Sequence, residues 1–414
     1  MKITCKKLLI VGECAIATRL AKVLSKNKEL EKIYVTSCTS KKSDDKIEYL
    51  DIREDDVTEL LSFAITNSID LTIPCSIKTI KSDIVSFFQS NEQNIYGPSK
   101  NAGKIVWDNV YAKKFLYKIH AQTSQFSVFD KIQYAIDYLK NAKYPVLIRT
   151  QEYNGVEDRL VASTIDLARD FLEKLFSNNE TNILVEEFTQ GHNFTLYFVT
   201  DGYTAIPITT VANYKFMADG DSGIYTNGVG CYSPDYKISQ NTIGQLHKIV
   251  LNTLNSLRNR NNEYVGILGV NCTLKDEKNF VVNEFYNFFQ QHDVTAILNT
   301  FEDDFLNIAF DCINGLFSDE YEGIKTNDLC SVSCVVNSKK ASENLFVEDI
   351  LDVDIFGLKL VEDTYLTTVG KQFAITKTSS TLNSAKTRLY NELDDINCKY
   401  LQYRKDIGKT IEDY

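Results

Sequence analysis

Carboxylates recur at three places where strand-like segments end or a glycine-rich loop begins. They lie in Val185-Glu-Glu-Phe188, Asp219-Gly-Asp-Ser-Gly223 and Asn283-Glu-Phe285. Carboxylate oxygens are the hard ligands that Mg²⁺ prefers, and a basic residue on a neighbouring strand would meet the phosphates of a nucleotide. Together the three segments indicate a nucleotide–magnesium site, although each one alone is more often a solvated strand end.

The first hundred residues contain the elements of a parallel sheet. Lys7–Val11 reads as a strand and Ala15–Ser25 has helical spacing, and this alternation continues to a last short strand before Gly97-Pro98. Alternating strands and helices predict a doubly wound α/β domain whose ligand edge lies at the carboxyl ends of the strands. Gly12 follows the first strand without the further glycines of G-x-G-x-x-G, so a dinucleotide site is not expected there.

The pattern changes after Pro98. Two strands, Tyr144–Thr150 and Arg159–Ala162, flank the polar loop Gln151–Asp158, and a glycine-rich segment follows at Asp219–Pro234. From about Asn327 short strands mix with one helix. These shifts predict an N-terminal doubly wound domain over residues 1–98, a central domain over 99–326 and a small mixed α/β domain over 327–414.

Composition limits the partners of the chain. Its 414 residues carry a formal net charge of −11, which leaves no basic footprint for duplex nucleic acid or an anionic membrane. No apolar run approaches the roughly 18 residues that a membrane span needs. Ten scattered cysteines without a C-x-x-C pair, and only four histidines, indicate reduced thiols and no zinc site. We expect a cytoplasmic protein that acts on small molecules, as a monomer or weak homodimer.

The order of the motifs is more specific than any one of them. The segments are Ile95-Tyr-Gly-Pro98, Val185-Glu-Glu-Phe188, Asp219-x-Asp-x-Gly223 with Gly228-Val-Gly-Cys-Tyr-Ser-Pro234, Glu284-Phe285, and Tyr403-Arg-Lys-Asp-Ile-Gly408. In this order the chain resembles the phosphoribosylamine–glycine ligases, a family of ATP-grasp enzymes in purine synthesis. The resemblance implies a doubly wound domain, a central ATP-grasp domain and a small C-terminal domain. It also implies that ATP phosphorylates the carboxylate of glycine and that the amine of phosphoribosylamine displaces phosphate.

The resemblance further implies roles for individual residues. Arg149 and Lys215 would face the phosphates, and Asp219 and Asp221 would position the amine and glycine. The expected nucleotide-binding residues are Lys113, Glu186, Glu187, Phe188, Gly223 and Gly228. Glu284 and Asn287 would hold Mg²⁺ or Mn²⁺.

Several motifs depart from the family pattern. The metal-binding Glu-x-Asn becomes Glu284-Phe-Tyr286, which leaves Asn287 one position out of register. The loop Gln151–Asp158 brings acidic residues to the place where the triphosphate should lie, and Arg149 stands for a lysine. Cys14-Ala-Ile-Ala-Thr18 replaces a substrate segment with Arg-Glu-His. Three functions therefore stay open at this point: the ligase itself, a degenerate binding or regulatory homologue, and a ligase retargeted to another acid or amine.

Overall fold

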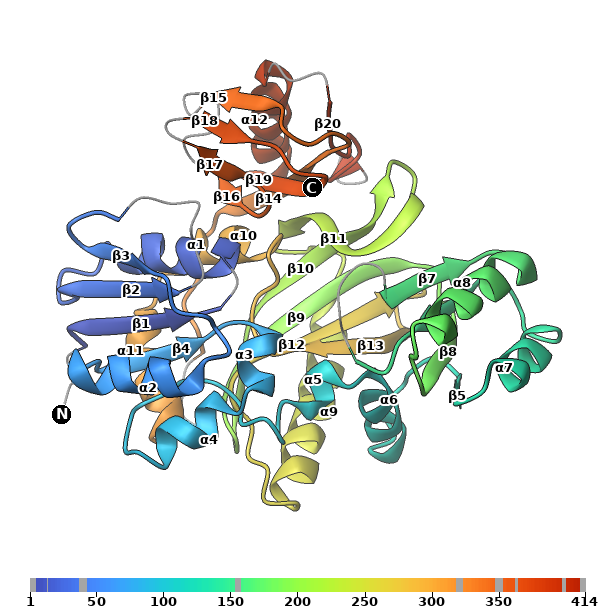
Figure 1. The fold of residues 1–414 in the computed structure, drawn as a ribbon, viewed down its shortest axis with the longest axis horizontal. Coiled ribbons are helices and arrows are strands. Elements are labelled where there is room, and N and C mark those ends of the chain that lie inside the picture. Colours follow the sequence, from blue (N-terminus) through green and yellow to red (C-terminus); the bar gives the residue numbers. More distant parts are fainter. Residues whose placement is uncertain are drawn as a thin grey trace.

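The computed structural model describes residues 5–12, 14–36, 43–152, 158–317, 323–346, 353–361, 364–396 and 400–409. Figure 1 shows the N-terminal sheet beside a large central sheet, a small sheet at the opposite end, and the C-terminal elements above the central sheet. Within the described part of the chain, no helix has the length and apolarity to cross a membrane.

The N-terminal sheet is parallel and buried on both faces. Its order is β3-β2-β1-β4, with β1 (Lys7–Val11), β2 (Lys32–Thr36), β3 (Ile47–Leu50) and β4 (Leu71–Pro74). The helices around it are α1 (Cys14–Leu24), α2 (Val57–Thr66), α3 (Ile77–Lys81) and α4 (Ile84–Gln89). Leu8 and Ile10 pack with α1, whereas Leu9 and Val11 pack with α2 and α4. Because helices cover both faces, the predicted doubly wound sheet is confirmed.

A small antiparallel sheet carries the predicted nucleotide-binding residues Glu186 and Glu187 on β8 (Ile183–Glu187), which we call the hinge strand. Its order is β5-β8-β6-β7, with β5 (Phe126–Phe129), β6 (Val146–Arg149) and β7 (Arg159–Ala162) as the other strands. Two amphipathic helices, α7 (Ile132–Leu139) and α8 (Ile165–Ser177), bury their apolar faces against it. The linker helices α5 (Lys104–Trp107) and α6 (Asn109–Lys118) lead into this sheet.

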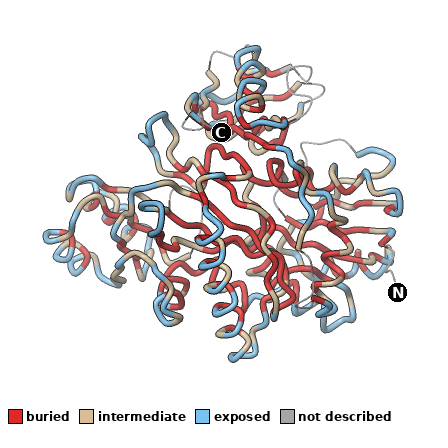
Figure 2. The backbone as a smooth tube through the Cα atoms, turned by 180° about the vertical axis from the view of Figure 1, so that it is seen from behind, coloured by how far each residue is buried: buried red, intermediate tan, exposed pale blue. Residues whose placement is uncertain are grey.

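The central sheet has nine strands and is antiparallel. Its order is β13-β12-β9-β10-β11-β14-β19-β16, and β20 pairs with β14. The strands are β9 (His192–Asp201), β10 (Ala205–Ala218), β11 (Ser222–Ser233), β12 (Val265–Leu274), β13 (Phe280–Tyr286), β14 (Cys330–Ser338), β16 (Asp354–Ile355), β19 (Gly370–Ser379) and β20 (Leu401–Gln402). The long helix α9 (Gln240–Arg258) packs Leu246, Val250 and Leu254 onto one face of it. Figure 2 shows the continuous buried backbone through this region.

The C-terminal elements are joined to the central sheet rather than separate from it. Strand β14 pairs with β11 from Gly230↔Cys334 to Ser233↔Ser331. The helix α12 (Leu382–Asp395) and a three-stranded sheet of β15 (Asn344–Phe346), β17 (Lys359–Val361) and β18 (Thr364–Leu366) complete the region. Between the two parts lie α10 (Val294–Leu298) and α11 (Phe305–Ile313). The predicted mixed α/β character is confirmed, while the boundary at residue 326 stays a prediction.

Candidate active site

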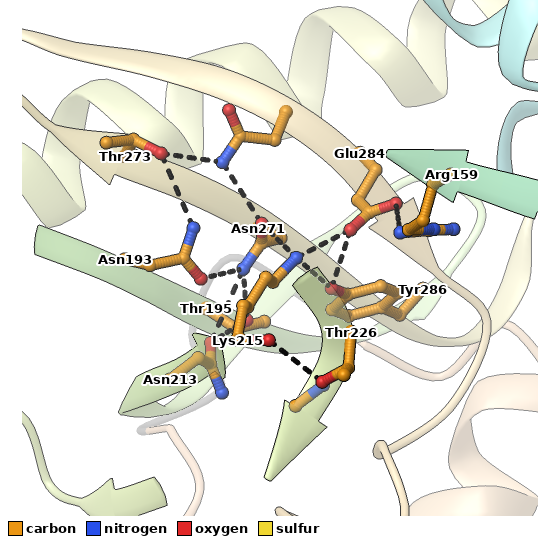
Figure 3. Close-up of polar contacts among 12 residues, drawn as sticks. Arg159, Asn193, Thr195, Asn213, Lys215, Thr226, Asn271, Thr273, Glu284 and Tyr286 are labelled. Atoms are coloured by element: carbon orange, nitrogen blue, oxygen red, sulfur yellow. Dashed lines mark hydrogen bonds and ion pairs between the residues drawn. The ribbon is translucent and has the colours of Figure 1, made fainter. Parts of the chain in front are cut away.

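Strand register places a row of polar side chains on one face of the central sheet. Thr195 of β9 pairs with Asn271 of β12, which in turn pairs with Glu284 of β13. The next residue along each strand is apolar and packs toward α9, because successive side chains point to opposite faces. Asn271 donates to Thr195 Oγ1 at 3.0 Å and to Asn193 Oδ1 at 3.0 Å. Figure 3 shows this hydrogen-bond network, which holds the polar side chains next to Glu284 in position.

Lys215 of β10 directs its ammonium group at Glu284. Its Nζ lies 2.6 Å from Glu284 Oε1, 3.0 Å from Asn271 Oδ1 and 3.0 Å from the Tyr286 hydroxyl (Figure 3). Tyr286 in turn donates to Glu284 Oε1 at 3.0 Å. All three hydrogens of the buried ammonium group therefore have acceptors.

Two arginines reach the other oxygen of Glu284 from the small sheet. Arg149 and Arg159 face each other across the β6–β7 hairpin. Their Nη1 atoms lie 3.2 Å and 3.5 Å from Glu284 Oε2. Arg159 also pairs with Asp158 at 3.2 Å. Like charges directly across a strand pair repel, so these carboxylates are what allow both arginines to be buried.

A second buried carboxylate, Glu186 of β8, continues the network. Arg149 Nε donates to its Oε1 at 2.7 Å, and Lys113 Nζ of α6 lies 2.6 Å from its Oε2. Lys113 also donates to Thr123 Oγ1 at 2.8 Å. We call the residues Lys113, Arg149, Asp158, Arg159, Glu186, Lys215 and Glu284 the charged cluster.

The cluster keeps both of its glutamates ionised. Burial alone would raise the pKa of Glu284, but Lys215, Arg159 and Arg149 hold that pKa well below its ordinary value of 4.5. Burial likewise opposes ionisation of Glu186, and Arg149 with Lys113 outweighs it, so the pKa of Glu186 is also lowered. Burial and the neighbouring Glu284 raise the pKa of the Tyr286 phenol, which stays protonated and can donate.

Three cavities meet at this cluster. One of about 20 Å³ lies between β6, β8 and β13 and includes Arg149, Glu186 and Glu284 in its wall. A second, of about 600 Å³, shares Phe188 and Tyr225 with the first and reaches Lys215. The third, of about 80 Å³, includes Glu284 and the buried Asn287.

The hinge strand supplies an aromatic wall to the larger cavity. Phe188 packs edge-to-face on Phe216 and on Tyr225, with ring centroids 6.0 Å and 5.8 Å away. Glu187 is exposed at the end of β8, in contrast to the buried Glu186 beside it. A flat ring bordered by polar groups would fit such a wall.

The glycine-rich turn is bound by the C-terminal region. Arg404 lies 2.8 Å from Asp221 Oδ1, and the backbone N–H of Lys405 donates to Asp219 Oδ1 at 2.8 Å. Gly223 sits in the same turn with φ +79°. The structure therefore does not bring Asp219 and Asp221 into the charged cluster, and their part in placing an amine or glycine stays a prediction.

Gly228 lies further along β11 with φ +148°, and a Cβ there would overlap the His292 ring. The carbonyl of Gly228 accepts from Lys371 Nζ at 2.6 Å. Asn287, the other predicted metal ligand, has a buried amide nitrogen without a partner. Residues 153–157, most of the predicted phosphate-covering loop, lie outside the described residues.

Sequence reasoning missed Arg159 and Asn271. A hairpin around the loop Gln151–Asp158 would have placed Arg159 opposite Arg149, so a signal was present. Asn271 is a polar residue inside an otherwise apolar strand, which is also a usable signal because buried amides need partners.

Comparison with protein families decides the relationship. Residues 6–105 match the N domain of phosphoribosylglycinamide synthetase, and residues 108–293 match its ATP-grasp (A) domain. The chain belongs to the phosphoribosylglycinamide synthetase family. The resemblance found in the motifs is thereby confirmed.

Relatives and solved structures agree with the family. The chain is 26% identical to the phosphoribosylamine–glycine ligase of Lactococcus lactis over 97% of this chain and 99% of that protein. It is 24% identical to the Clostridium acetobutylicum phosphoribosylamine–glycine ligase, over 98% of this chain and 100% of that protein. The crystal structure of the Thermotoga maritima phosphoribosylamine–glycine ligase superposes with a TM-score of 0.79, at 17% identity, over 97% of this chain and 100% of that one. A biotin carboxylase from Campylobacter jejuni in complex with an ATP analogue has a TM-score of 0.71, at 14% identity, over 99% and 95% of the two chains. The expected ATP-grasp fold is confirmed.

Proposed function

We propose that this chain is an ATP-dependent ligase that joins glycine to 5-phosphoribosylamine and forms glycinamide ribonucleotide. In this reaction the glycine carboxylate attacks the γ-phosphorus of ATP, giving glycyl phosphate and ADP. The amine of phosphoribosylamine then attacks the glycyl carbonyl, phosphate leaves, and the amine loses a proton. Relatives that span nearly the whole chain carry this activity in their names.

One observation carries the proposal: four buried cations converge beside the hinge strand of an ATP-grasp fold. Arg149, Arg159 and Lys215 surround one end of the cluster, and Lys113 lies at the other. Charge on a transferring phosphoryl group is stabilised best by cations already fixed in a water-poor site. The aromatic wall with Phe188 would take the nucleobase, which places the phosphates toward Lys215 and Arg149.

The sequence analysis also expects Glu284 and Asn287 to bind Mg²⁺ or Mn²⁺. Glu284 is the only one of the two with a charge, and Lys215, Arg149 and Arg159 already pair with it. The residues present do not fit a divalent cation, so no step of the proposed reaction is assigned to one.

The test is glycine-dependent release of ADP with phosphoribosylamine generated in situ. Lys215→Met should abolish it, because the variant loses the cation closest to Glu284 and the phosphates. Lys248→Met is the matched control, since Lys248 is exposed on α9, which packs on the opposite face of the central sheet. ATP binding without glycine-dependent release in the unaltered chain would refute the ligase.

A second candidate is a nucleotide-binding homologue without turnover. The observation that favours it is that Glu284 already pairs with three cations. The fold and the cations that would face the phosphates are intact, but the carboxylate expected to bind the catalytic metal is not free to do so. The same assay separates the two functions.

A further inference from the structure

Every acceptor position of the Glu284 carboxylate is taken. Lys215 and Tyr286 donate to Oε1, and Arg149 and Arg159 donate to Oε2. An ionised carboxylate offers about four lone-pair sites, so these four donors satisfy it completely.

The surroundings oppose a divalent ion as well. Mg²⁺ bonded to Glu284 at about 2.0–2.1 Å would stand among three positive groups whose nitrogens lie no more than 3.5 Å from the same oxygens. The buried amide nitrogen of Asn287 has no partner, and this N–H₂ group is a donor that a cation cannot satisfy. A metal could bind here only by displacing cations that the fold holds in place.

Among the described residues of the charged cluster, positively charged groups outnumber carboxylates. Four cations (Lys113, Arg149, Arg159 and Lys215) face three carboxylates, those of Asp158, Glu186 and Glu284. Arginine can bind two oxygens of one phosphate through its planar fork, so an incoming phosphate can exchange with Glu284 as the partner of Arg149 and Arg159.

From these contacts we infer that the phosphates of a nucleotide bind at Arg149, Arg159 and Lys215 without a divalent metal. The cations do the charge neutralisation that a metal would otherwise do, and Glu284 is a competing anion rather than a ligand. The inference rests on the proposed nucleotide site but does not require turnover.

Calorimetric titration with ADP tests the inference directly. We expect dissociation constants in excess Mg²⁺ and in EDTA that agree within about twofold. Titration with Mn²⁺ alone, followed by the electron paramagnetic resonance of free Mn²⁺, should show no bound ion at a protein concentration of about 0.1 mM. Binding that is tenfold or more tighter with Mg²⁺ would overturn the inference.

The change in ADP affinity caused by Glu284→Gln is a second test, because the two roles of Glu284 predict changes of opposite sign. If Glu284 holds a metal, the variant should bind ADP more weakly in Mg²⁺ buffer. If it competes with phosphate, as inferred, the variant should bind about three- to tenfold more tightly in both buffers. Far-UV circular dichroism and the thermal midpoint of the variant verify that it is folded, and the unaltered chain in EDTA gives an answer even if it is not.

Substitutions of Tyr286 test whether this phenol, and not the cations, keeps a metal away from Glu284. Tyr286→Asn removes the phenol that donates to Glu284 and supplies an amide oxygen two residues from the carboxylate, and Tyr286→Phe removes the hydroxyl alone. We expect neither variant to bind Mn²⁺ while Arg149, Arg159 and Lys215 remain. Mn²⁺ binding by Tyr286→Asn but not Tyr286→Phe would show that Tyr286, and not the cations, excludes the metal, which would overturn the inference. Absence of ADP binding in both buffers would also overturn it, whereas ADP binding without ADP release in the ligase assay would refute the ligase alone.

Discussion

Arg404 of the C-terminal region holds Asp221 of the β10–β11 turn at 2.8 Å. It also donates to both oxygens of Asp406 at 2.7 Å and lies over the ring of Tyr214, 4.7 Å from the centroid. The guanidinium is almost fully buried, and together with the Lys405 N–H bond to Asp219 it fixes the glycine-rich turn to the last described segment of the chain.

Replacing Arg404 should therefore destabilise the protein. Arg404→Met leaves Asp406 without its cation and should lower the free energy of unfolding by about 1–3 kcal/mol, because water can partly solvate the carboxylates of Asp406 and Asp221. Urea denaturation measures this change. Lys405→Ala, at the exposed neighbouring position, should change the unfolding free energy by less than about 0.5 kcal/mol. Equal effects of the two substitutions would contradict the role of Arg404.

Gly228 should not tolerate a side chain. Its φ of +148° disfavours any L residue, and a Cβ would overlap the His292 ring. We expect Gly228→Ala to lower the free energy of unfolding by about 1–3 kcal/mol or more, from strain and displacement of His292. Gly244→Ala is the control: it lies within α9 with open space around it, and should stabilise the helix by about 0.5–1 kcal/mol. Thermal unfolding distinguishes these opposite signs.

The charged cluster should make stability depend on pH in the acid range. The pKa of Glu284 in the folded protein lies well below the ordinary value of 4.5, so its contribution is fully present above about pH 4.5 and is lost as the pH falls through the folded value. The urea midpoint should fall between about pH 5 and pH 3.

Glu284→Gln should flatten this pH dependence, because the group that takes up the proton is gone. Glu187→Gln removes an exposed carboxylate from the end of the neighbouring strand β8 and should keep the slope of the unaltered chain. An identical slope in Glu284→Gln and the unaltered chain would mean that other carboxylates cause the acid instability.

Phe188 should contribute to nucleotide affinity through its ring. Phe188→Ala opens the aromatic wall of the 600 Å³ cavity and should weaken ADP binding about tenfold, in the range found for base–aromatic contacts. Calorimetry measures the loss. Tyr117→Ala, at an aromatic that is 74% exposed on α6, should leave the affinity unchanged. If Phe188→Ala also binds normally, the nucleobase lies elsewhere.

The sequence was sufficient for the fold and for part of the site. Strand–helix alternation predicted the parallel sheet, and the order of short motifs predicted the family. Glu186 and Glu284 were expected at the site because carboxylates stand at the ends of strand-like segments, and Lys215 was expected from the resemblance to the ligase family. The contact of Lys215 with Glu284 follows from β10, β9, β12 and β13 lying side by side in one sheet.

The rest depended on contacts between segments far apart in the chain. Arg149 and Glu284 are separated by 135 residues and Arg404 and Asp221 by 183 residues, and no local pattern indicates either pair. The carboxylates of the glycine-rich turn were visible in the sequence, but not the arginine that binds one of them. Likewise, Glu284 was predicted as a metal ligand from its own position in the sequence. The three cations that pair with it come from strands of two different sheets, which the sequence did not indicate.

Because β14 pairs with β11, the small C-terminal region also covers a strand edge of the central sheet. Without β14, the backbone donors and acceptors of β11 from Gly230 to Ser233 would be left open on a buried part of that strand, which is a template for association with other chains. A chain that ends near residue 326 should therefore aggregate rather than yield a working two-domain fragment. In the intact protein, the sheet should unfold as one cooperative unit across the boundary between these two parts of the chain.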